Sequence, residues 1–461
     1  MSDAESPLGA GTGMPMKHSR AYRLRRFFNW FILGLTYATF YMGRYNINVV
    51  KHHVEGTFLG GSQTEFGIIA LCGFWTYAAS EFVNGPVADR IGGRKAILIG
   101  AFGAGSFNLL IGLLFLGGFT NHLILFMSLL YAGNMFFQSF GAMSVVKVNA
   151  PWFHVNERGV FGGIFGIMIS LGYVMALSTA GWIMKLSAKV SWLPWYFTFV
   201  APSIAMGIMF LISWLFVRDR PSDAGYEDFS TADASDGDET PVDFNYIVKH
   251  VFTNRIILTL MAAEFCTGFV RQSVLFFFPE WLKTQHGIAP GSGLFNVATT
   301  GITIGGIAGG LLAGWLSDRF FNSRRPPVAF FFYLAQVVAV LALGWATTPL
   351  FAAMGIGLCC MFIFGVHGML SGTASMDFGG KKGAASAAGM LDGIQYVASG
   401  ITSVGMGMLL DHFGWGVWTY SIVPFSLIGA IIMTRLWNEK PKAHEVVQTL
   451  TVEAEPPAEA A

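Results

Sequence analysis

The chain has 461 residues, of which 53% are hydrophobic and only 12% are charged, and its formal net charge is +1. Soluble domains carry roughly 25% charged residues, so this composition excludes a soluble protein and predicts one that crosses a membrane many times. The balanced charge gives no indication of a nucleic-acid partner. The cysteines lie inside apolar segments without the spacing of metal ligands, so we expect neither a metal nor a cofactor.

Long apolar segments recur along the whole chain. At about 20 residues per span, they predict twelve transmembrane helices and no strands, because the apolar runs are too long and do not alternate with polar residues. The 57 glycines are typical of helices that pack closely in lipid. The expected spans are 27–50, 65–88, 96–117, 122–149, 157–183, 194–217, 254–282, 292–317, 327–347, 350–375, 383–411 and 416–437.

Basic residues gather at alternate ends of these spans, for example at Lys17–Arg26 and at Arg218. By the positive-inside rule these ends face the cytoplasm, so we expect both termini and the central loop there. The polar N-terminal segment 1–26 runs directly into a full-length span, which argues against a cleavable signal. We therefore expect a multi-pass protein of the cell's inner (plasma) membrane.

The first span carries an arginine within an apolar run. Tyr37 and Tyr41 precede Arg44 at helical spacing, so the three side chains share one face of a helix, and Asn48 extends the stripe. A charge near the bilayer centre costs roughly 2.5–3.5 kcal/mol, and a guanidinium beside phenols offers a forked set of donors for phosphate or carboxylate oxygens. The pattern predicts an anion site, with a purely structural ion pair as the alternative. The polar residues 51–53 that follow are expected on the surface of an outer loop.

The second span carries a carboxylate, Glu81, on one face with Tyr77. Desolvation favours the neutral form of a carboxyl group in a membrane. Glu81 is therefore either a proton carrier or a counter-charge to an arginine, and the sequence leaves both open. The span ends in a GxxxDRxGGRK run, whose glycine allows close helix approach and whose charges can latch helix ends during conformational change. The residues of this loop motif are Gly85, Asp89, Arg90 and Arg94.

An acidic, proline-containing stretch at 218–250 divides the chain. We expect it to be a solvated cytoplasmic linker between two halves with six spans each, 27–217 and 251–440. The segment 441–461 is expected to be a disordered tail. This arrangement predicts the fold class: an all-α membrane protein built from two pseudo-symmetric helical halves.

Each half of the chain carries one arginine within an apolar segment, followed by a GxxxDR motif. Arg44 and Arg271 are 227 positions apart, and the GxxxDR copies that follow them at positions 85 and 314 are 229 apart. Parallel repeats place a substrate site near the bilayer midplane, between the halves. An arginine at matched depth in each half therefore predicts a symmetric site for an anion.

Further polar residues of the C-terminal half are expected to line this site. Glu264 lies one heptad before Arg271 on the same helical face and is a competing ion-pair partner for it. His367 on the tenth span is either a site residue or a packing histidine. The eleventh span carries a polar stripe of Asp392, Gln395 and Tyr396.

Four segments of the chain resemble the organophosphate:phosphate antiporters of the major facilitator superfamily, which include the bacterial glycerol-3-phosphate and hexose-6-phosphate transporters. These are YxxFYxxRxN from Tyr37 to Asn46, DRPSDAG after the sixth span, the helix from Arg271 to Pro279, and KKGAASAAG at 381–389. The resemblance implies a twelve-helix fold with rocker-switch alternating access. It also implies exchange of inorganic phosphate for a phosphorylated metabolite at Arg44, Arg271, Tyr37 and Tyr41.

Three functions are compatible with these residues. The first is exchange of an organophosphate for inorganic phosphate, with substrate bridging the two arginines. The second is proton-coupled symport of an organic acid, with Glu81 or Asp392 as the proton carrier. The third is a transporter-like membrane sensor of a phosphorylated sugar. An enzyme is not expected, because the sequence shows no nucleophile–base pair, and we expect the protein to act in the bilayer as a monomer.

Overall fold

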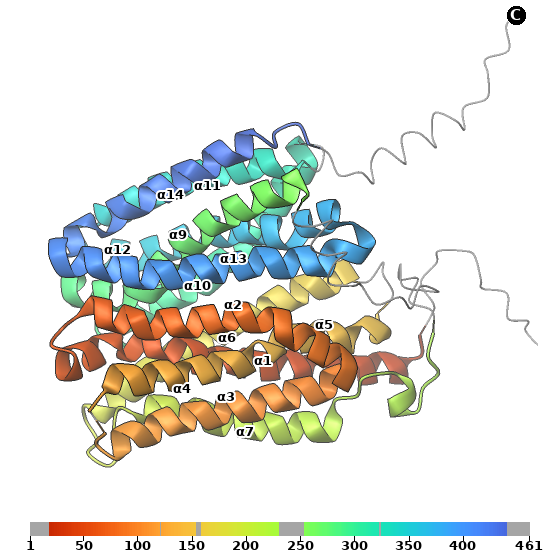
Figure 1. Cartoon of the computed structure of the whole chain (residues 1–461), viewed down its shortest axis with the longest axis horizontal. Coiled ribbons are helices and arrows are strands. Elements are labelled where there is room, and N and C mark those ends of the chain that lie inside the picture. The colour runs from red at the N-terminus through yellow and green to blue at the C-terminus, as the bar shows by residue number, and fades with distance from the viewer. Residues whose placement is uncertain (1–17, 120, 154–157, 230–252, 322–323, 440–461) are drawn as a thin grey trace, which may run out of the picture.

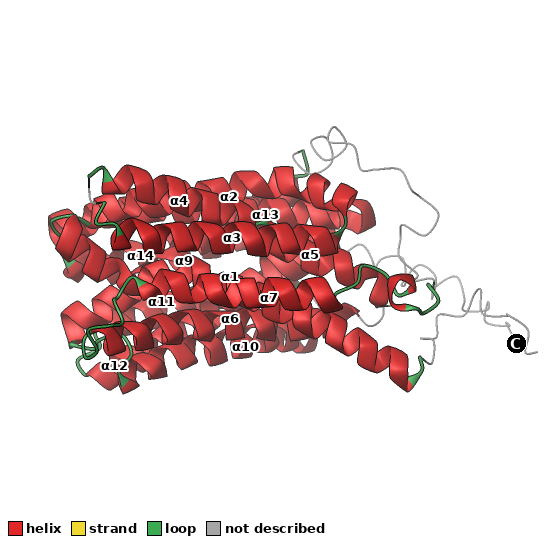
Figure 2. Ribbon diagram, turned by 90° about the horizontal axis from the view of Figure 1, so that it is seen from below, coloured by secondary structure: helices red, strands yellow, loops and turns green. Residues whose placement is uncertain are grey.

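A single bundle of long helices forms the body of the molecule (Figure 1). The computed structural model describes residues 18–119, 121–153, 158–229, 253–321 and 324–439. Within these ranges the regular secondary structure is entirely helical, as Figure 2 shows, which confirms the predicted all-α class. Most of the expected linker and the whole of the expected tail lie outside the described residues.

Each expected span coincides with a helix or with two consecutive helical segments. The helices before the linker are α1 (Arg20–Phe58), α2 (Gln63–Ile91), α3 (Gly93–Leu116), α4 (Leu123–Gln138), α5 (Phe140–Asn149), α6 (Arg158–Ser187) and α7 (Phe197–Phe216). The later ones are α9 (Arg255–His286), α10 (Gly293–Phe320), α11 (Arg325–Gly344), α12 (Pro349–His367), the π-helical turn η4 (Gly368–Ala374), α13 (Ser375–Phe413) and α14 (Trp418–Thr434).

In the described part of the chain, 10 helical segments are long and apolar enough to cross a membrane. Helices α1 and α2 are not among them, although they have 39 and 29 residues. Several polar residues that make these two helices less apolar, among them Arg44, Lys51 and Asn84, are buried and do not lie on the outer surface of the bundle. That surface carries large apolar side chains, among them Phe102, Leu311 and Phe351, as a lipid-facing surface requires.

Side-chain caps fix several helix starts. Ser19, Ser62 and Asn254 accept hydrogen bonds from backbone amides in the first turns of α1, α2 and α9. Each cap satisfies a donor that the helix itself leaves unpaired. The serine or asparagine at the end of each preceding polar segment therefore fixes the residue at which the helix begins.

Two sets of helices, α1–α7 and α9–α14, lie side by side (Figure 1). Between the sets, α2 packs against α13, α6 against α10, and α1 against α9. Within the second set, α10 and α12 approach so closely that a Cβ on Gly309 would lie 1.9 Å from the carbonyl oxygen of Met361. Only glycine permits this contact, in keeping with the small residues expected at helix interfaces in lipid.

The bundle has two ends, which we call the near face and the far face. The near face is where α1 begins and α7 ends, and the far face is where α1 ends and α2 begins. At the far face Asp411 of α13 accepts hydrogen bonds from the backbone amides of Gln63 and Thr64, at 2.8 and 2.9 Å. A carboxylate from the second set thus caps a helix of the first set, so the sets are joined at this end.

At the near face, one residue of the loop motif has a described partner. The backbone amide of Arg94 donates to Asp219 at 2.8 Å, and its guanidinium donates to the carbonyl oxygen of Trp214. The surroundings of Gly85 and the side chains of Asp89 and Arg90 lie outside the described part of the structure. Their role as a conformational latch stays a prediction.

The expectation that Lys51 lies on an exposed loop was wrong. Helix α1 continues to Phe58, and the Lys51 side chain is fully buried inside the bundle. The run of one lysine and two histidines resembles a loop in sequence. The helix continues through it because Glu280 on α9 compensates the lysine charge and Gln63 on α2 accepts a hydrogen bond from the ammonium.

Candidate substrate site

The Arg44 side chain is fully buried at the middle of the bundle. Its Nε donates to Gln138 Oε1 at 2.8 Å, and its Nη1 donates to the Tyr396 hydroxyl at 2.8 Å. The other terminal nitrogen, Nη2, is buried and has no hydrogen-bond partner among the described residues. A buried guanidinium donor without an acceptor is costly, so the site is one acceptor short.

A chain of amides holds the Arg44 partner in place. Gln138 Nε2 donates to Asn134 Oδ1 at 3.0 Å, and Asn108 Nδ2 donates to the same oxygen at 2.8 Å. Asn134 in turn donates to the backbone carbonyl of Gly43 at 2.9 Å. Because every amide has a fixed neighbour, the Gln138 oxygen is oriented toward Arg44 before any ligand binds.

Aromatic rings surround the Arg44 guanidinium. Its central carbon lies 4.4 Å from the ring centroid of Tyr77 and 5.0 Å from that of Tyr41. The faces of these rings attract a cation, so they partly compensate the buried charge without supplying a full negative charge. The arginine therefore remains available to an anion.

Arg271 reaches the same place from α9. Its guanidinium carbon lies 5.2 Å from the ring centroid of Tyr396, the residue whose hydroxyl binds Arg44. Among the described residues no carboxylate lies within 4.0 Å of either guanidinium, so the competing pair of Arg271 with Glu264 is not formed. The structure thus brings the two sequence-predicted arginines to one tyrosine.

Further tyrosines extend this aromatic region. Tyr37 lies beside Tyr41 on α1, with ring centroids 5.4 Å apart, and both are buried. Tyr173 of α6 donates to the hydroxyl of Tyr45 at 2.8 Å, and its ring lies 5.0 Å from that of Tyr41. Tyr37 and Tyr41 thus lie where the sequence predicts them, on the Arg44 face of α1.

The two membrane carboxylates on α2 and α13 lie together. Glu81 and Asp392 are within hydrogen-bonding reach of each other, and Arg44 lies close enough to interact electrostatically with Glu81. Two carboxyl groups in contact favour a shared proton over two negative charges. This pair joins the two sets of helices beside the arginines.

His367, Glu264 and Gln395 form a second polar cluster in the C-terminal half. Gln395 Nε2 lies 2.9 Å from His367 Nδ1 and 3.4 Å from Glu264 Oε2, and His367 Nδ1 lies 3.5 Å from Glu264 Oε1. The amide can donate to both neighbours only if His367 Nδ1 carries no proton. His367 and Gln395 therefore contact Glu264 rather than an arginine, although Gln395 directly precedes Tyr396 in the chain.

Three residues of the site were not predicted from sequence. Gln138 and Tyr131 of α4 contact Arg44 through its Nε and its backbone carbonyl, and Tyr173 contacts Tyr45. The signal for Gln138 was its place one turn after Asn134 within an apolar run. Polar amides inside membrane helices mark helix contacts or sites, but the sequence does not show which arginine they face.

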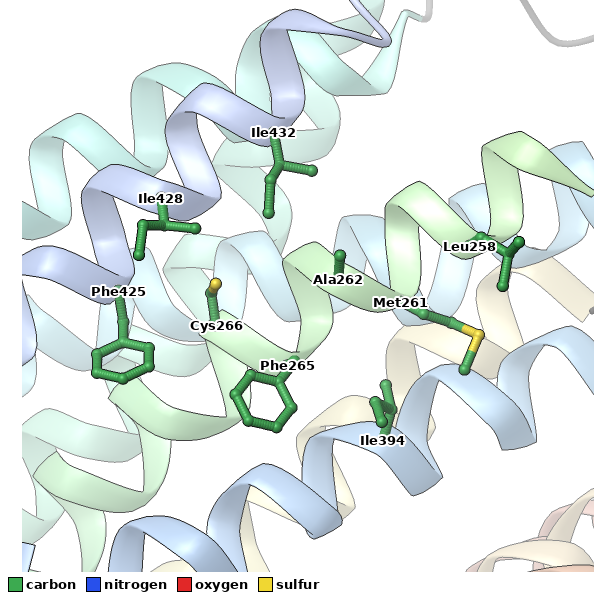
Figure 3. Close-up of a pocket in the computed structure, with 9 residues that line it drawn as sticks. All are labelled: Leu258, Met261, Ala262, Phe265, Cys266, Ile394, Phe425, Ile428 and Ile432. Atoms are coloured by element: carbon green, nitrogen blue, oxygen red, sulfur yellow. The ribbon is translucent and has the colours of Figure 1, made fainter. Parts of the chain in front are cut away.

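A hollow in the structure lies away from the arginines. It has a volume of about 450 Å³ and lies between α9, α13 and α14 (Figure 3). Its lining is apolar, with Met261, Phe265 and Phe425 among the residues drawn, and it carries no group that could bind an anion. Its position beside lipid-exposed residues such as Leu258 and Ile428 marks it as a groove in the outer surface.

The fold and the paired buried arginines define a multi-pass membrane transporter. Residues 33–403 match the model of the Major Facilitator Superfamily. The chain belongs to this family.

The relatives of this chain include two transporters of phosphorylated compounds and a membrane sensor protein. The glycerol-3-phosphate transporter of Bacillus subtilis (strain 168) is 26% identical over 443 residues, which cover 93% of this chain and 96% of the relative. A probable hexose phosphate transport protein of Chlamydia trachomatis is 25% identical and covers 92% of each chain. The membrane sensor protein UhpC of Salmonella typhimurium is also 25% identical, over 88% of this chain and 90% of the relative.

Solved structures share the fold. A bacterial homolog of the human lysosomal transporter Spinster, in an inward-facing and unoccupied conformation, superposes with a TM-score of 0.74. It is 16% identical, and the match covers 96% of this chain and 100% of the other. A D-xylose-proton symporter gives a TM-score of 0.68 at 15% identity. At this identity the likeness concerns the fold alone.

Proposed function

We propose that the protein is a secondary active transporter that exchanges a phosphorylated metabolite for inorganic phosphate by alternating access. The observation that carries the proposal is the placement of Arg44 and Arg271 at one tyrosine, with Arg44 Nη2 unpaired and no carboxylate of the described residues in ion-pair contact. A phosphoryl group has the charge and the several acceptor oxygens that two forked guanidinium donors can bind. The relatives that transport glycerol phosphate and hexose phosphate support this class of substrate.

The same geometry gives a physical reason for exchange. When the site is empty, the two guanidinium groups both contact Tyr396, and only aromatic faces and neutral oxygens are in direct contact with them. The nearby carboxyl pair of Glu81 and Asp392 lies beyond ion-pair distance. Closing the bundle over uncompensated charges is unfavourable, whereas a bound anion compensates both. The conformational switch is therefore favoured only in the loaded state, from either side.

The basic residues support one orientation. Arg94, Arg218 and Arg325 lie at the near face, so we place this face and both chain ends in the cytoplasm, following the positive-inside rule. The membrane is the inner (plasma) membrane, and the unit of transport is the monomer, since both arginines come from one chain.

Exchange in proteoliposomes tests the proposal. Vesicles loaded with inorganic phosphate take up labelled phosphate, and phosphorylated and carboxylated metabolites compete. Arg44→Ala and Arg271→Ala each remove charge-assisted bonds of about 1.5–3 kcal/mol, so each lowers apparent phosphate affinity by roughly 10- to 100-fold. Arg255→Ala is the matched control, because Arg255 is exposed at the near end of α9.

Two results would contradict the proposal. A folded, reconstituted protein that exchanges no phosphate is not an exchanger of this kind. Binding of a phosphorylated sugar without turnover would instead indicate a sensor, as UhpC is named.

The contact between Glu81 and Asp392 favours a second candidate function, proton-coupled transport of an organic acid. A shared proton between two membrane carboxyl groups is suited to uptake and release during the cycle. This candidate predicts uptake driven by a pH gradient without internal phosphate, and loss of that uptake in Glu81→Gln. Uptake that requires internal phosphate and ignores the pH gradient would exclude it.

A further inference from the structure

A second charged cluster lies in the far half of the bundle, apart from the arginines. Lys51 of α1 donates to Glu280 of α9 and to Gln63 of α2, and its Nζ lies 2.5 Å from Glu55 Oε1. Gln63 Nε2 also donates to Glu280 Oε1 at 2.5 Å. One lysine therefore joins both sets of helices, seven residues beyond Arg44 and about 10 Å farther along the helix axis.

The cluster is closed off from water. The exposed fraction is 0% for Lys51, 1% for Glu55 and 4% for Glu280. The Lys51 ammonium also lies 4.8 Å from the ring centroid of Phe277, which is fully buried. These contacts can form only while the far ends of α1, α2 and α9 are together, so they belong to a state in which the far face is shut.

The charges of this cluster do not balance. One ammonium faces two carboxyl groups, and Glu55 and Glu280 are also within hydrogen-bonding reach of each other. The Glu55 carboxyl group makes no hydrogen bond to any other described group. A net negative charge at this depth is costly, and one proton on the carboxyl pair removes it.

None of the other titratable groups around Glu55 and Glu280 neutralises the net negative charge of the cluster in place of this proton. His52 Nδ1 lies 3.6 Å from Glu280 Oε1, but its side chain is 38% exposed, so water screens it. Lys283 lies one turn beyond Glu280 and is exposed. Two histidines on the packed helices lie against tryptophans, His53 against Trp195 and His286 against Trp281. The other groups are Glu65 in the first turn of α2, Asp411 at the α2 cap and the exposed His412.

We propose that Glu55 and Glu280 bind one proton when the far face closes and release it when the far face opens. The inference rests on the proposed alternating access but not on the identity of the substrate. The proton enters and leaves on the far side only, because the buried residues Phe276 and Phe277 lie on α9 between Arg271 and Glu280. The cluster therefore regulates the cycle without carrying protons across the membrane.

The sign of the effect follows from linkage. The closed state binds one more proton than the open state, so acid at the far face favours closure and alkali favours opening. For one proton the ratio of closed to open molecules changes by at most tenfold per pH unit. Glu55→Gln supplies a neutral group of the same shape, so it abolishes this dependence and keeps the far face closed at alkaline pH.

The experiment measures the opening directly. Spin labels are attached at Ala188→Cys and Gln285→Cys, two exposed positions at the far face, just after α6 and in the last turn of α9. The native cysteines are replaced beforehand. Pulsed electron paramagnetic resonance then gives the distance distribution at about pH 5 to 9 in the absence of substrate. We expect the short-distance population to fall as pH rises in the parent protein and to stay constant in Glu55→Gln.

Matched variants separate the possible sources of the pH effect. Glu65→Gln changes the same chemical group outside the cluster and should keep the parent's profile. Glu280→Gln leaves one carboxylate for the lysine and should flatten the profile, as Glu55→Gln does. A monodisperse size-exclusion profile for each variant shows that it is folded.

Three outcomes would overturn the inference. They are a flat profile in the parent, an unchanged profile in Glu55→Gln, or a profile lost in His52→Gln, which would assign the proton to the histidine. Phosphate exchange is measured on the same preparations. If phosphate exchange is absent, the proposed substrate is wrong. The pH dependence of the spin-label distance would still show whether Glu55 and Glu280 bind the proton.

Discussion

Arg44 and Tyr396 are joined by a 2.8 Å hydrogen bond although they lie 352 positions apart in the chain. The same tyrosine ring lies 5.2 Å from the guanidinium carbon of Arg271. Tyr396 thus contacts both arginines, through its hydroxyl on one side and its ring on the other. An anion that bridges the arginines must share this position with the phenol.

Removing only the hydroxyl tests this relationship. Tyr396→Phe keeps the ring against Arg271 but removes the acceptor of Arg44 Nη1. A lost hydrogen bond to a charged group is worth about 1.5–3 kcal/mol, so we expect the initial rate of phosphate exchange to fall by about tenfold or more. Tyr420→Phe is the control, because its hydroxyl accepts from Trp345 at the exposed surface. Equal rates for Tyr396→Phe and the parent would show that the bond has no part in transport.

Gln138 offers a test that changes the charge of the site. Gln138→Glu places a carboxylate 2.8 Å from Arg44 Nε, where the amide oxygen now lies. The resulting ion pair compensates the guanidinium permanently, so we expect anion exchange to be lost while the protein stays folded. Labelled phosphate uptake and a thermal unfolding curve measure the two properties separately. The exposed Gln285→Glu on α9 is the control, and phosphate uptake that survives in Gln138→Glu would argue against direct binding at Arg44.

The sequence predicted the arginines of the site but not the groups that hold them. A charge inside an apolar run is visible without a structure because its burial needs a reason, and so Arg44 and Arg271 could be found. Gln138 could not be assigned to Arg44, since its contact depends on how α4 is rotated against α1. Lys51 was missed for a related reason: its partners are on α2 and α9, and without them a charged residue after an apolar run indicates the end of a helix.

The contact between α6 and α10 gives a way to lock the far face. The hydroxyl oxygens of Ser178 and Thr299 lie 3.4 Å apart, close enough for cysteines at these positions to form a disulfide. Ser178→Cys with Thr299→Cys, oxidised in a background without native cysteines, should hold the far ends together and stop exchange. Reduction should restore it. Each single variant is the control, and full exchange by the oxidised double variant would show that the two helices do not separate during transport.

Changing the charges of Lys51 and Glu280, in the charged cluster of the far half, tests whether these residues hold the two sets of helices together. Lys51→Met leaves Glu55 and Glu280 buried without a cation, and breaking a buried pair in this way costs about 3–5 kcal/mol. We expect the far face to open, seen as a longer distance between spin labels at positions 188 and 285. Lys51→Glu with Glu280→Lys restores one cation between two carboxylates, so the double variant should recover the short distance that each single change loses. If the double variant stays open, the cluster holds the far face through the geometry of these side chains rather than through their charges.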